Sequence, residues 1–183
     1  TLENVAVNNI RSLATGEEAK FALTFGRTLG RIAASSYLVG LAEGVLDITL
    51  DYLKTREQFG KPIGSFQSLQ HRAVDLYIRK VLATSCLTEA CRNFDNAGDV
   101  SNMAIAASRA KYRATETALQ CARQAVQMHG GIGYTDECSV GLYLNRALVV
   151  AAWLGNSRFH ARKLTSLLSE KRPGEESSRK AAN

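Results

Sequence analysis

A glycine-rich segment is the part of this sequence most able to contact a ligand. Residues 127–134 read QMHGGIGY, and they place three glycines directly after a long helical pattern. Glycine can end a helix in a left-handed conformation, and it lets the backbone approach a ligand closely. Gly130 and Gly131 taken alone would be typical of an ordinary helix end, so the interpretation depends on what accompanies them.

Arg56, Phe59 and Gln67 lie about 60–70 residues upstream, beside a predicted turn. An arginine at a helix end can pair with a phosphate through its planar fork, and an aromatic ring can stack on a base. A glutamine at a helix start lies where anions are favoured. Each residue alone has a structural explanation: a surface arginine, a core phenylalanine and an exposed amide. Together with the glycine segment, they predict a phosphate-bearing cofactor lying against helices.

Five helical patterns must position these residues. Apolar residues recur at intervals of three and four over about 17–55, 65–96, 99–129, 139–152 and 157–171. We expect Ser65 to cap the second helix and Tyr77 to lie on its buried face. We expect Leu144, Ala147, Leu148, Ala151 and Ala152 to share one face of the fourth helix, and we expect Phe159 and Leu168 to be among the apolar residues of the last. The predicted fold is all-α, an up-down four-helix bundle with an extra short C-terminal helix.

The first and third helices carry the clearest core patterns. Small residues that allow close helix approach form a continuous stripe on the third helix. The expected core residues of these two helices are Leu38, Leu41, Ala42, Val45, Leu46, Thr49, Leu53, Ala110, Ala114, Thr117, Ala118, Cys121, Ala125 and Met128.

Composition narrows the function classes. The 183-residue chain is 45% hydrophobic, carries two prolines and has a formal net charge of +6. Its basic residues are not interleaved with aromatics, so we do not expect nucleic-acid binding. The four cysteines form no CxxC pair, and the three histidines have no ligand spacing, so we expect reduced thiols and no metal site. We expect no membrane-spanning run and no signal peptide.

The motifs in this order resemble the C-terminal domain of the acyl-CoA dehydrogenases, a family of FAD-dependent flavoproteins. The matching text is YLKTREQFGKPIG at 52–64, then Phe66–Gln67, then 127–134, and the resemblance extends over about 17–170. Family members are dimers or tetramers whose subunits also contain an N-terminal helical domain and a middle β-domain. Residues 1–16 resemble the exit from that β-domain, and residues 17–171 resemble the bundle. Residues 172–183 are charged and rich in serine, so we expect a disordered tail. Because the chain begins at Thr1, we expect a fragment or a processed product.

The resemblance also implies roles for single residues. Arg56 resembles the arginine that reaches FAD phosphates held mainly by a neighbouring subunit, and Phe59 resembles the aromatic residue beside the adenine. Further FAD contacts are implied for Gln67, Gln127, His129, Gly130, Gly131, Asn156 and Ser157. Arg31 and Gly155 match positions near the acyl-CoA substrate.

The main departure from the family concerns the catalytic base. Family members remove a weakly acidic proton alpha to a thioester with a glutamate, while hydride passes to the flavin. One known position of that glutamate is occupied here by Leu154 and the other by Gly30, and neither residue can accept a proton. Glu43, Asp47 and Asp136 are more typical of solvated or capping carboxylates. We therefore assign no catalytic residue.

Four functions remain open at this point. The chain could be the C-terminal part of an FAD-dependent acyl-CoA dehydrogenase, or the non-catalytic subunit of a heteromeric one, which the retained flavin contacts favour. A flavin monooxygenase of the same fold needs no such base, and a plain helical interaction module needs no flavin. The resemblance implies an acyl-CoA substrate, an electron-acceptor flavoprotein, a homo- or hetero-oligomer and a bacterial cytoplasmic location.

Overall fold

Nearly all of the described chain is helical. The computed structural model describes residues 3–4, 13–96 and 100–170. In chain order the elements are α1 (Gly16–Thr55), β1 (Glu57–Gln58), β2 (Lys61–Pro62), the 3-10 turn η1 (Ile63–Ser65), α2 (Gln67–Asp95), α3 (Val100–His129), the 3-10 segment η2 (Gly130–Tyr134), α4 (Val140–Ala152) and α5 (Ser157–Glu170).

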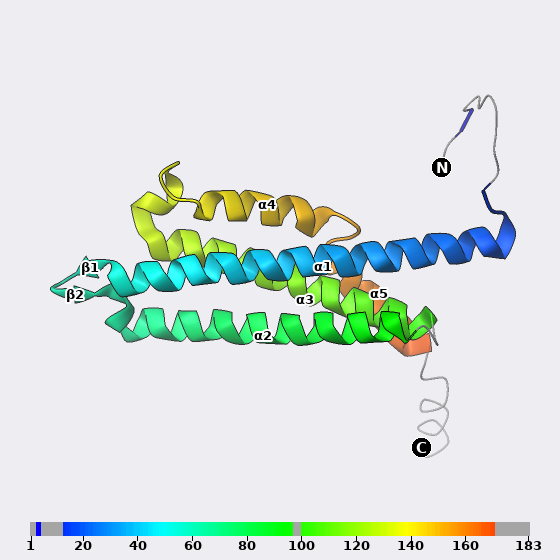
Figure 1. Cartoon of the computed structure of the whole chain (residues 1–183), viewed down its shortest axis with the longest axis horizontal. Coiled ribbons are helices and arrows are strands. Elements are labelled where there is room, and N and C mark those ends of the chain that lie inside the picture. The colour runs from blue at the N-terminus through cyan, green and yellow to red at the C-terminus, as the bar shows by residue number, and fades with distance from the viewer. Residues whose placement is uncertain (1–2, 5–12, 97–99, 171–183) are drawn as a thin grey trace, which may run out of the picture.

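The helices form an elongated bundle with short connections. α1, α2 and α3 run side by side in alternating directions, and α4 returns along the other side of α1 and α3 (Figure 1). α5 packs against α3 near the end of the molecule where α2 finishes. The predicted all-α, up-down four-helix bundle with an additional C-terminal helix is confirmed.

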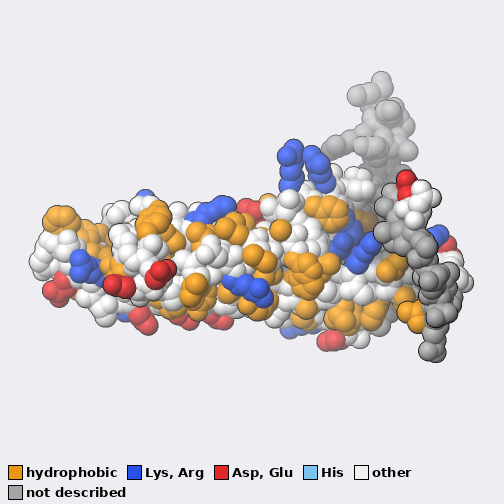
Figure 2. Space-filling view, turned by 90° about the horizontal axis from the view of Figure 1, so that it is seen from above, with side chains coloured by type: hydrophobic (Ala, Val, Ile, Leu, Met, Phe, Trp, Pro, Cys, Tyr) orange, Lys and Arg blue, Asp and Glu red, His pale blue; other side chains and the backbone are white. Residues whose placement is uncertain are grey.

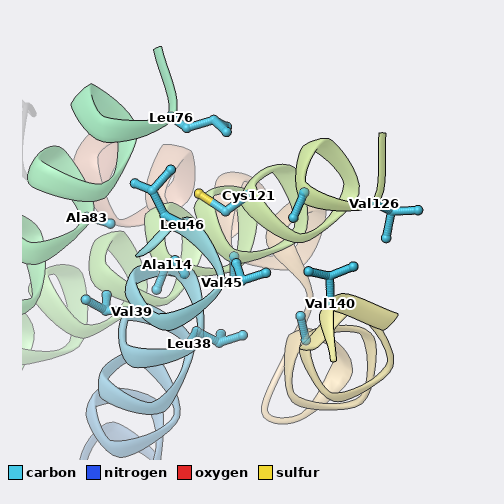
Figure 3. Packing of buried hydrophobic residues seen from close by; sticks show 14 of the residues in the cluster. Leu38, Val39, Val45, Leu46, Leu76, Ala83, Ala114, Cys121, Val126 and Val140 are labelled. Atoms are coloured by element: carbon cyan, nitrogen blue, oxygen red, sulfur yellow. The ribbon is translucent and has the colours of Figure 1, made fainter. Parts of the chain in front are cut away.

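The core is centred on α3, which contacts each of the other four α-helices. Side chains from α1, α2 and α3 point toward one another, and Val140 of α4 joins them from the side (Figure 3). The small-residue stripe of α3 is buried as predicted, with Ala114 and Ala118 at most 1% exposed. Because these residues lack bulk, α1, α2 and α4 approach the α3 backbone closely.

A two-residue hairpin separates α1 from α2. β1 pairs antiparallel with β2, with Glu57 opposite Pro62 and Gln58 opposite Lys61. Phe59 and Gly60 between them both have positive φ, 56° and 76°. Such a pair is typical of the tight turns whose twist matches that of the flanking strands.

Two predictions for α2 are wrong. Ser65 does not cap the helix: the capping position is Phe66, and the Ser65 hydroxyl donates to the Pro62 carbonyl at 2.7 Å instead. Tyr77 is not buried but 55% exposed. The hydrophobic spacing was correct, but α2 touches the bundle along a narrow strip that buries only three of its residues.

The buried faces of α4 and α5 are also narrower than predicted. Leu148 and Ala152 are exposed, although Ala147 and Ala151 are buried. On α5, Phe159 and Leu168 are each almost half exposed. α4 packs mainly on α3 and less on α1, and α5 packs chiefly on α3, so each buries a single stripe.

One expectation about membranes needs correction. α1 contains an 18-residue window with a mean hydropathy of 1.3, long and apolar enough to cross a membrane by length and composition. Half of that window is buried inside the bundle, and the core helix of a soluble protein passes the same test. The predicted tail at 172–183 and most of the predicted lead-in at 1–16 lie outside the described residues.

The small-residue stripe of α3 leads to a stability prediction. Ala114→Leu inserts a branched side chain where the residue is fully buried, so the free energy of unfolding should fall by about 1–3 kcal/mol. Glu116→Leu, at an exposed position on the same helix, should change it by less than about 0.5 kcal/mol. Urea denaturation measures both values, and equal effects would contradict the close packing at Ala114.

Candidate functional site

The first group of predicted residues lies at one end of the bundle. Arg56 follows the last residue of α1, Gln67 is the first residue of α2, and the glycine segment follows α3, so three helix ends meet there (Figure 1). Arg56 and Gln67 are exposed, and Arg56 takes part in none of the ion pairs found among the described residues. A guanidinium without a counter-charge and the start of a helix are both suited to bind phosphate.

Phe59 has an arrangement that packing does not explain. Its side chain is 90% exposed, so it is not the core phenylalanine that a structural interpretation would require. Its φ of 56° is unfavourable for a bulky residue, by about 1–3 kcal/mol. Its ring meets the edge of the Phe66 ring, with 6.1 Å between the ring centroids. A strained, solvent-facing aromatic residue is typical of a site where a flat ligand binds.

The three glycines of the segment do different things. Gly130 has a φ of 65° and ends α3 in the left-handed conformation. Gly133 packs against α3, where an added Cβ would lie 2.7 Å from the Val126 carbonyl oxygen. Nothing lies within 4 Å of a Cβ placed on Gly131, which leaves its backbone open to a ligand.

The side chains of His129 and Gln127 differ in how accessible they are to a ligand. The His129 ring is 5% exposed, stacks on Tyr52 at 4.3 Å and contacts the Ala125 carbonyl through Nδ1 at 2.8 Å. It therefore fixes the end of α3 against α1, while Gln127 is exposed. A hollow of about 360 Å³ beside Tyr52 and His129 adjoins Ile132 of the glycine segment.

The second group lies along the bundle, where the α4–α5 turn meets α1. The two positions that lack a base are in contact: a Cβ added to Gly30 would lie 2.8 Å from Leu154 Cδ1. Leu154 has a φ of 58°, an uncommon conformation for a branched apolar residue. The leucine side chain thus fills the place that either carboxylate would enter.

Gly155, Asn156 and Ser157 form the rest of this turn. Gly155 has a φ of 107°, and a Cβ there would lie 2.9 Å from His160 Nε2, so only glycine fits. The Asn156 side chain accepts a hydrogen bond from the Phe159 backbone N–H at 2.9 Å and so caps α5. Ser157, the first residue of α5, is half-buried. FAD contacts by these residues remain predictions.

Sequence reasoning missed the residue that holds the turn in place. Lys111 of α3 is fully buried, and its Nζ donates to the carbonyls of Val150, Ala151 and Gly155 at 3.1–3.2 Å. These carbonyls belong to the end of α4 and the turn, where helix geometry leaves acceptors without partners. The signal was present in the sequence, because Lys111 is one helical turn from the buried Ala114.

His160 supports the same turn from α5. Its Nε2 lies 3.2 Å from the Leu154 carbonyl oxygen, which can only accept, so Nε2 carries the proton and Nδ1 has a free lone pair. Nδ1 has no partner among the described residues. Burial, then the charges of Arg31 and Lys111, lower the pKa of His160 to about 4, so the ring is neutral at pH 7.

Arg31 lies beside this turn on α1. It is 7% exposed, its guanidinium carbon is 5.9 Å from the centre of the Phe159 ring, and its Nε has no partner among the described residues. Burial and then Arg27 lower the pKa of Arg31. The structure therefore brings Arg31 and the two base positions together at the α4–α5 turn, which contains Gly155. The roles of Arg31 and Gly155 in substrate binding stay predictions.

The two groups are far apart in the chain's own structure. Arg31 lies in the first half of α1 and Arg56 directly follows its end, and a rise of about 1.5 Å per residue separates them by roughly 37 Å. That separation exceeds the length of an extended dinucleotide. One bound molecule cannot contact both groups of a single chain.

The carboxylates considered as replacement bases lie elsewhere. Glu43 pairs with Lys80 of α2 at 3.0 Å, and Asp47 and Asp136 are exposed. No grouping of three or more metal-ligating side chains occurs within residues 3–4, 13–96 and 100–170, and all four cysteines are free.

Comparison with known proteins decides the family. The sequence model of the protein family "Acyl-CoA dehydrogenase, C-terminal domain" matches residues 22–166. This chain belongs to the acyl-CoA dehydrogenase family. The resemblance inferred from the motifs is confirmed, and the bundle corresponds to the C-terminal domain of that family of oxidoreductases.

Individual relatives agree with this assignment. Acyl-CoA dehydrogenase IpdE2 of Mycobacterium tuberculosis is 39% identical over 128 residues, which is 70% of this chain and 38% of that protein. A variant of the Tcur3481-Tcur3483 steroid ACAD is 32% identical with a TM-score of 0.79, over 84% of this chain and 42% of that one. The ChsE4-ChsE5 complex of Mycobacterium tuberculosis is 30% identical with a TM-score of 0.73, over 79% of this chain and 38% of that one. This acyl-CoA dehydrogenase domain thus spans about two fifths of the length of each relative.

The buried neutral histidine leads to a pH prediction. The folded pKa of His160, about 4, lies below its ordinary value of 6.5. As the pH falls through this window the unfolded chain binds the proton first, so the free energy of unfolding should fall, by on the order of 3 kcal/mol between pH 6.5 and pH 4. His160→Gln cannot take up this proton, and its stability should depend less steeply on pH.

Urea denaturation at several pH values from 7 to 4 measures these slopes. His71→Gln, at an exposed position on α2, is the matched control and should keep the wild-type slope. Equal slopes in wild type and His160→Gln would show that His160 is accessible to protons in the folded state.

Proposed function

We propose that this chain supplies the C-terminal domain of an FAD-dependent acyl-CoA dehydrogenase and that it is the subunit without a base in a heteromeric enzyme. The observation that carries the proposal is the contact between Gly30 and Leu154. The two places where the family resemblance locates a base meet in space, and both are apolar. The residues that the resemblance associates with FAD phosphates and adenine, Arg56 and Phe59, are present at the end of the bundle.

The end of the bundle fits an FAD molecule held mainly by another subunit. The unpaired guanidinium of Arg56 would bind its phosphates, and the exposed ring of Phe59 would lie beside the adenine. The open backbone at Gly131 would lie along the cofactor. When bound, FAD would supply the acceptor for the hydride that leaves the acyl chain.

The separation of the two groups favours an oligomer. Asn156 and Ser157 would lie beside the flavin of the chain's own site, while Arg56 would reach the cofactor of a neighbour about 37 Å away along α1. Each chain would then contribute to two flavin sites, which requires at least a dimer.

An exposed apolar stripe on α2 supports the same conclusion. Val74, Tyr77, Ile78, Val81 and Leu82 follow the three-and-four spacing of one helix face, and each is 42–55% exposed. A continuous apolar face of this kind is typical of a surface that packs against another subunit. A dimer or tetramer of such bundles would cover it.

Relatives support a partner of different sequence. The ChsE4-ChsE5 structure is a complex of two proteins. We extend the proposal to an acyl-CoA substrate, an electron-acceptor flavoprotein and a bacterial cytoplasmic location, the last because the four cysteines are free thiols.

The cofactor assignment is tested by replacing Arg56. In the full-length protein co-expressed with its partner subunit, Arg56→Gln should lose a charge-assisted phosphate contact and weaken FAD retention about tenfold or more. Lys54→Gln, two residues before Arg56 and 72% exposed, removes the same charge beside the site and should retain FAD as the wild type does. Visible absorbance after dialysis measures retained flavin, and unchanged retention in Arg56→Gln would remove this residue from the site.

The missing base is tested by restoring it. Wild-type subunit assembled without a catalytic partner should not lose its flavin absorbance when acyl-CoA is added without oxygen. Leu154→Glu places a carboxylate beside Gly30 and Arg31, and should reduce the flavin about 100-fold faster than Leu154→Gln, which has the same shape without the charge.

Two outcomes would contradict the proposal. Flavin reduction by the wild-type subunit alone would reveal another base. Turnover that needs oxygen and externally supplied reduced flavin would instead indicate a monooxygenase.

A further inference from the structure

Three cationic side chains from two helices gather beside the Gly30–Leu154 contact. Arg27 and Arg31 lie one turn apart on α1, and Lys163 lies in the second turn of α5. Burial and then Arg31 and Arg27 lower the pKa of Lys163, and burial and then Arg27 lower that of Arg31. The Arg31 guanidinium carbon lies 5.9 Å from the centre of the Phe159 ring, and Lys163 follows Phe159 by one turn of α5, so the geometry also brings Arg31 close to Lys163. Figure 2 shows Lys and Arg side chains distributed along the face seen from above, with hydrophobic side chains between them.

No described carboxylate balances this cluster. The four ion pairs found among the described residues include none of Arg27, Arg31 and Lys163. The groups that shift the pKa of Lys163 and of Arg31 are all cations. Arg27 is exposed, Lys163 is half-buried and Arg31 is buried. Like charges repel one another, and a buried charge such as that of Arg31 is normally paired. A bound anion would balance these charges.

Two buried polar atoms at this place also lack partners. Arg31 Nε is a donor without an acceptor on a side chain that is 93% buried, and His160 Nδ1 has a free lone pair on a fully buried ring. Arg31 and Lys163 both lower the pKa of His160, which places the histidine beside the same charges. A buried N–H group without a hydrogen-bond acceptor costs free energy, and an oxygen atom of a bound ligand would accept a hydrogen bond from Arg31 Nε.

We propose that Arg27, Arg31 and Lys163 form a carboxylate-binding site, and that its ligand is a CoA thioester whose acyl chain ends in a carboxylate. The planar guanidinium of Arg31 matches a carboxylate in shape, and the other two cations add positive charge from α1 and α5. The cluster adjoins the base positions, where the reacting carbons of an acyl group would lie. The phosphates of CoA are a whole pantetheine arm away from those carbons. The acyl-CoA part of the inference rests on the proposed function, whereas the carboxylate site does not.

Matched thioesters of equal length test this site. Glutaryl-CoA and valeryl-CoA differ only in the terminal carboxylate, and their dissociation constants can be measured by calorimetry on the full-length protein assembled with FAD and its partner. Glutaryl-CoA should bind at least about tenfold more tightly. In Arg27→Gln and in Lys163→Met the ratio of the two constants should fall toward one, and higher salt should reduce the wild-type ratio.

Arg162→Gln is the matched control. It removes one positive charge from an exposed position on α5 beside Lys163, and it should keep the wild-type ratio. Thermal unfolding of each variant establishes that it is folded. Equal affinity of the wild type for the two thioesters, or an equal loss of preference in Arg162→Gln, would overturn the carboxylate site.

A third outcome separates this inference from the proposed function. If neither thioester binds, the acyl-CoA function fails, and free glutarate at millimolar concentration tests the site by itself. Glutarate binding that is lost in Lys163→Met supports the carboxylate site without acyl-CoA. Absence of glutarate binding to the wild type overturns it.

Discussion

The close approach of every other α-helix to α3 is the constraint on which this structure depends. Alanines at 110, 114, 118 and 125 keep one side of α3 almost flat, so that α1, α2 and α4 can pack near its backbone. The same proximity lets a single lysine of α3 reach the last carbonyls of α4. Positioning of the α4–α5 turn is thus a consequence of core packing rather than of the turn's own sequence.

The fold was largely predictable because its signals are local and repeated. The number of helices and most of their limits follow from spacing, and so do the buried faces of α1 and α3. The predictions failed where tertiary context decides. Tyr77 follows the α2 pattern but faces outward, because α2 buries only a narrow strip. Ser65 has the right residue type for a cap, but its hydroxyl has a nearer acceptor in the hairpin.

The candidate site was predictable in part. The glycine-rich segment and the family resemblance were sufficient to select candidate site positions, which were Arg56, Phe59, Arg31, Leu154 and Gly155. No pattern indicated that Gly30 and Leu154, more than a hundred residues apart, would touch, because that contact depends on how α4 and α1 cross. The supporting role of His160 was equally hidden, whereas the position of Lys111, one helical turn from the buried Ala114, was a signal in the sequence. A lysine in a stripe of alanines looks like an exception to the pattern until its three carbonyl acceptors are seen.

The lysine clamp also bears on the order in which the molecule assembles. Lys111 and its carbonyl partners are about 40 residues apart in sequence, so the turn gains these bonds only after α4 has docked on α3. Leu154 and Gly155 then adopt their positive φ values in a scaffold that is already closed. We infer that the α4–α5 turn forms late, after the long helices, and that it is also the part most readily released while the bundle persists.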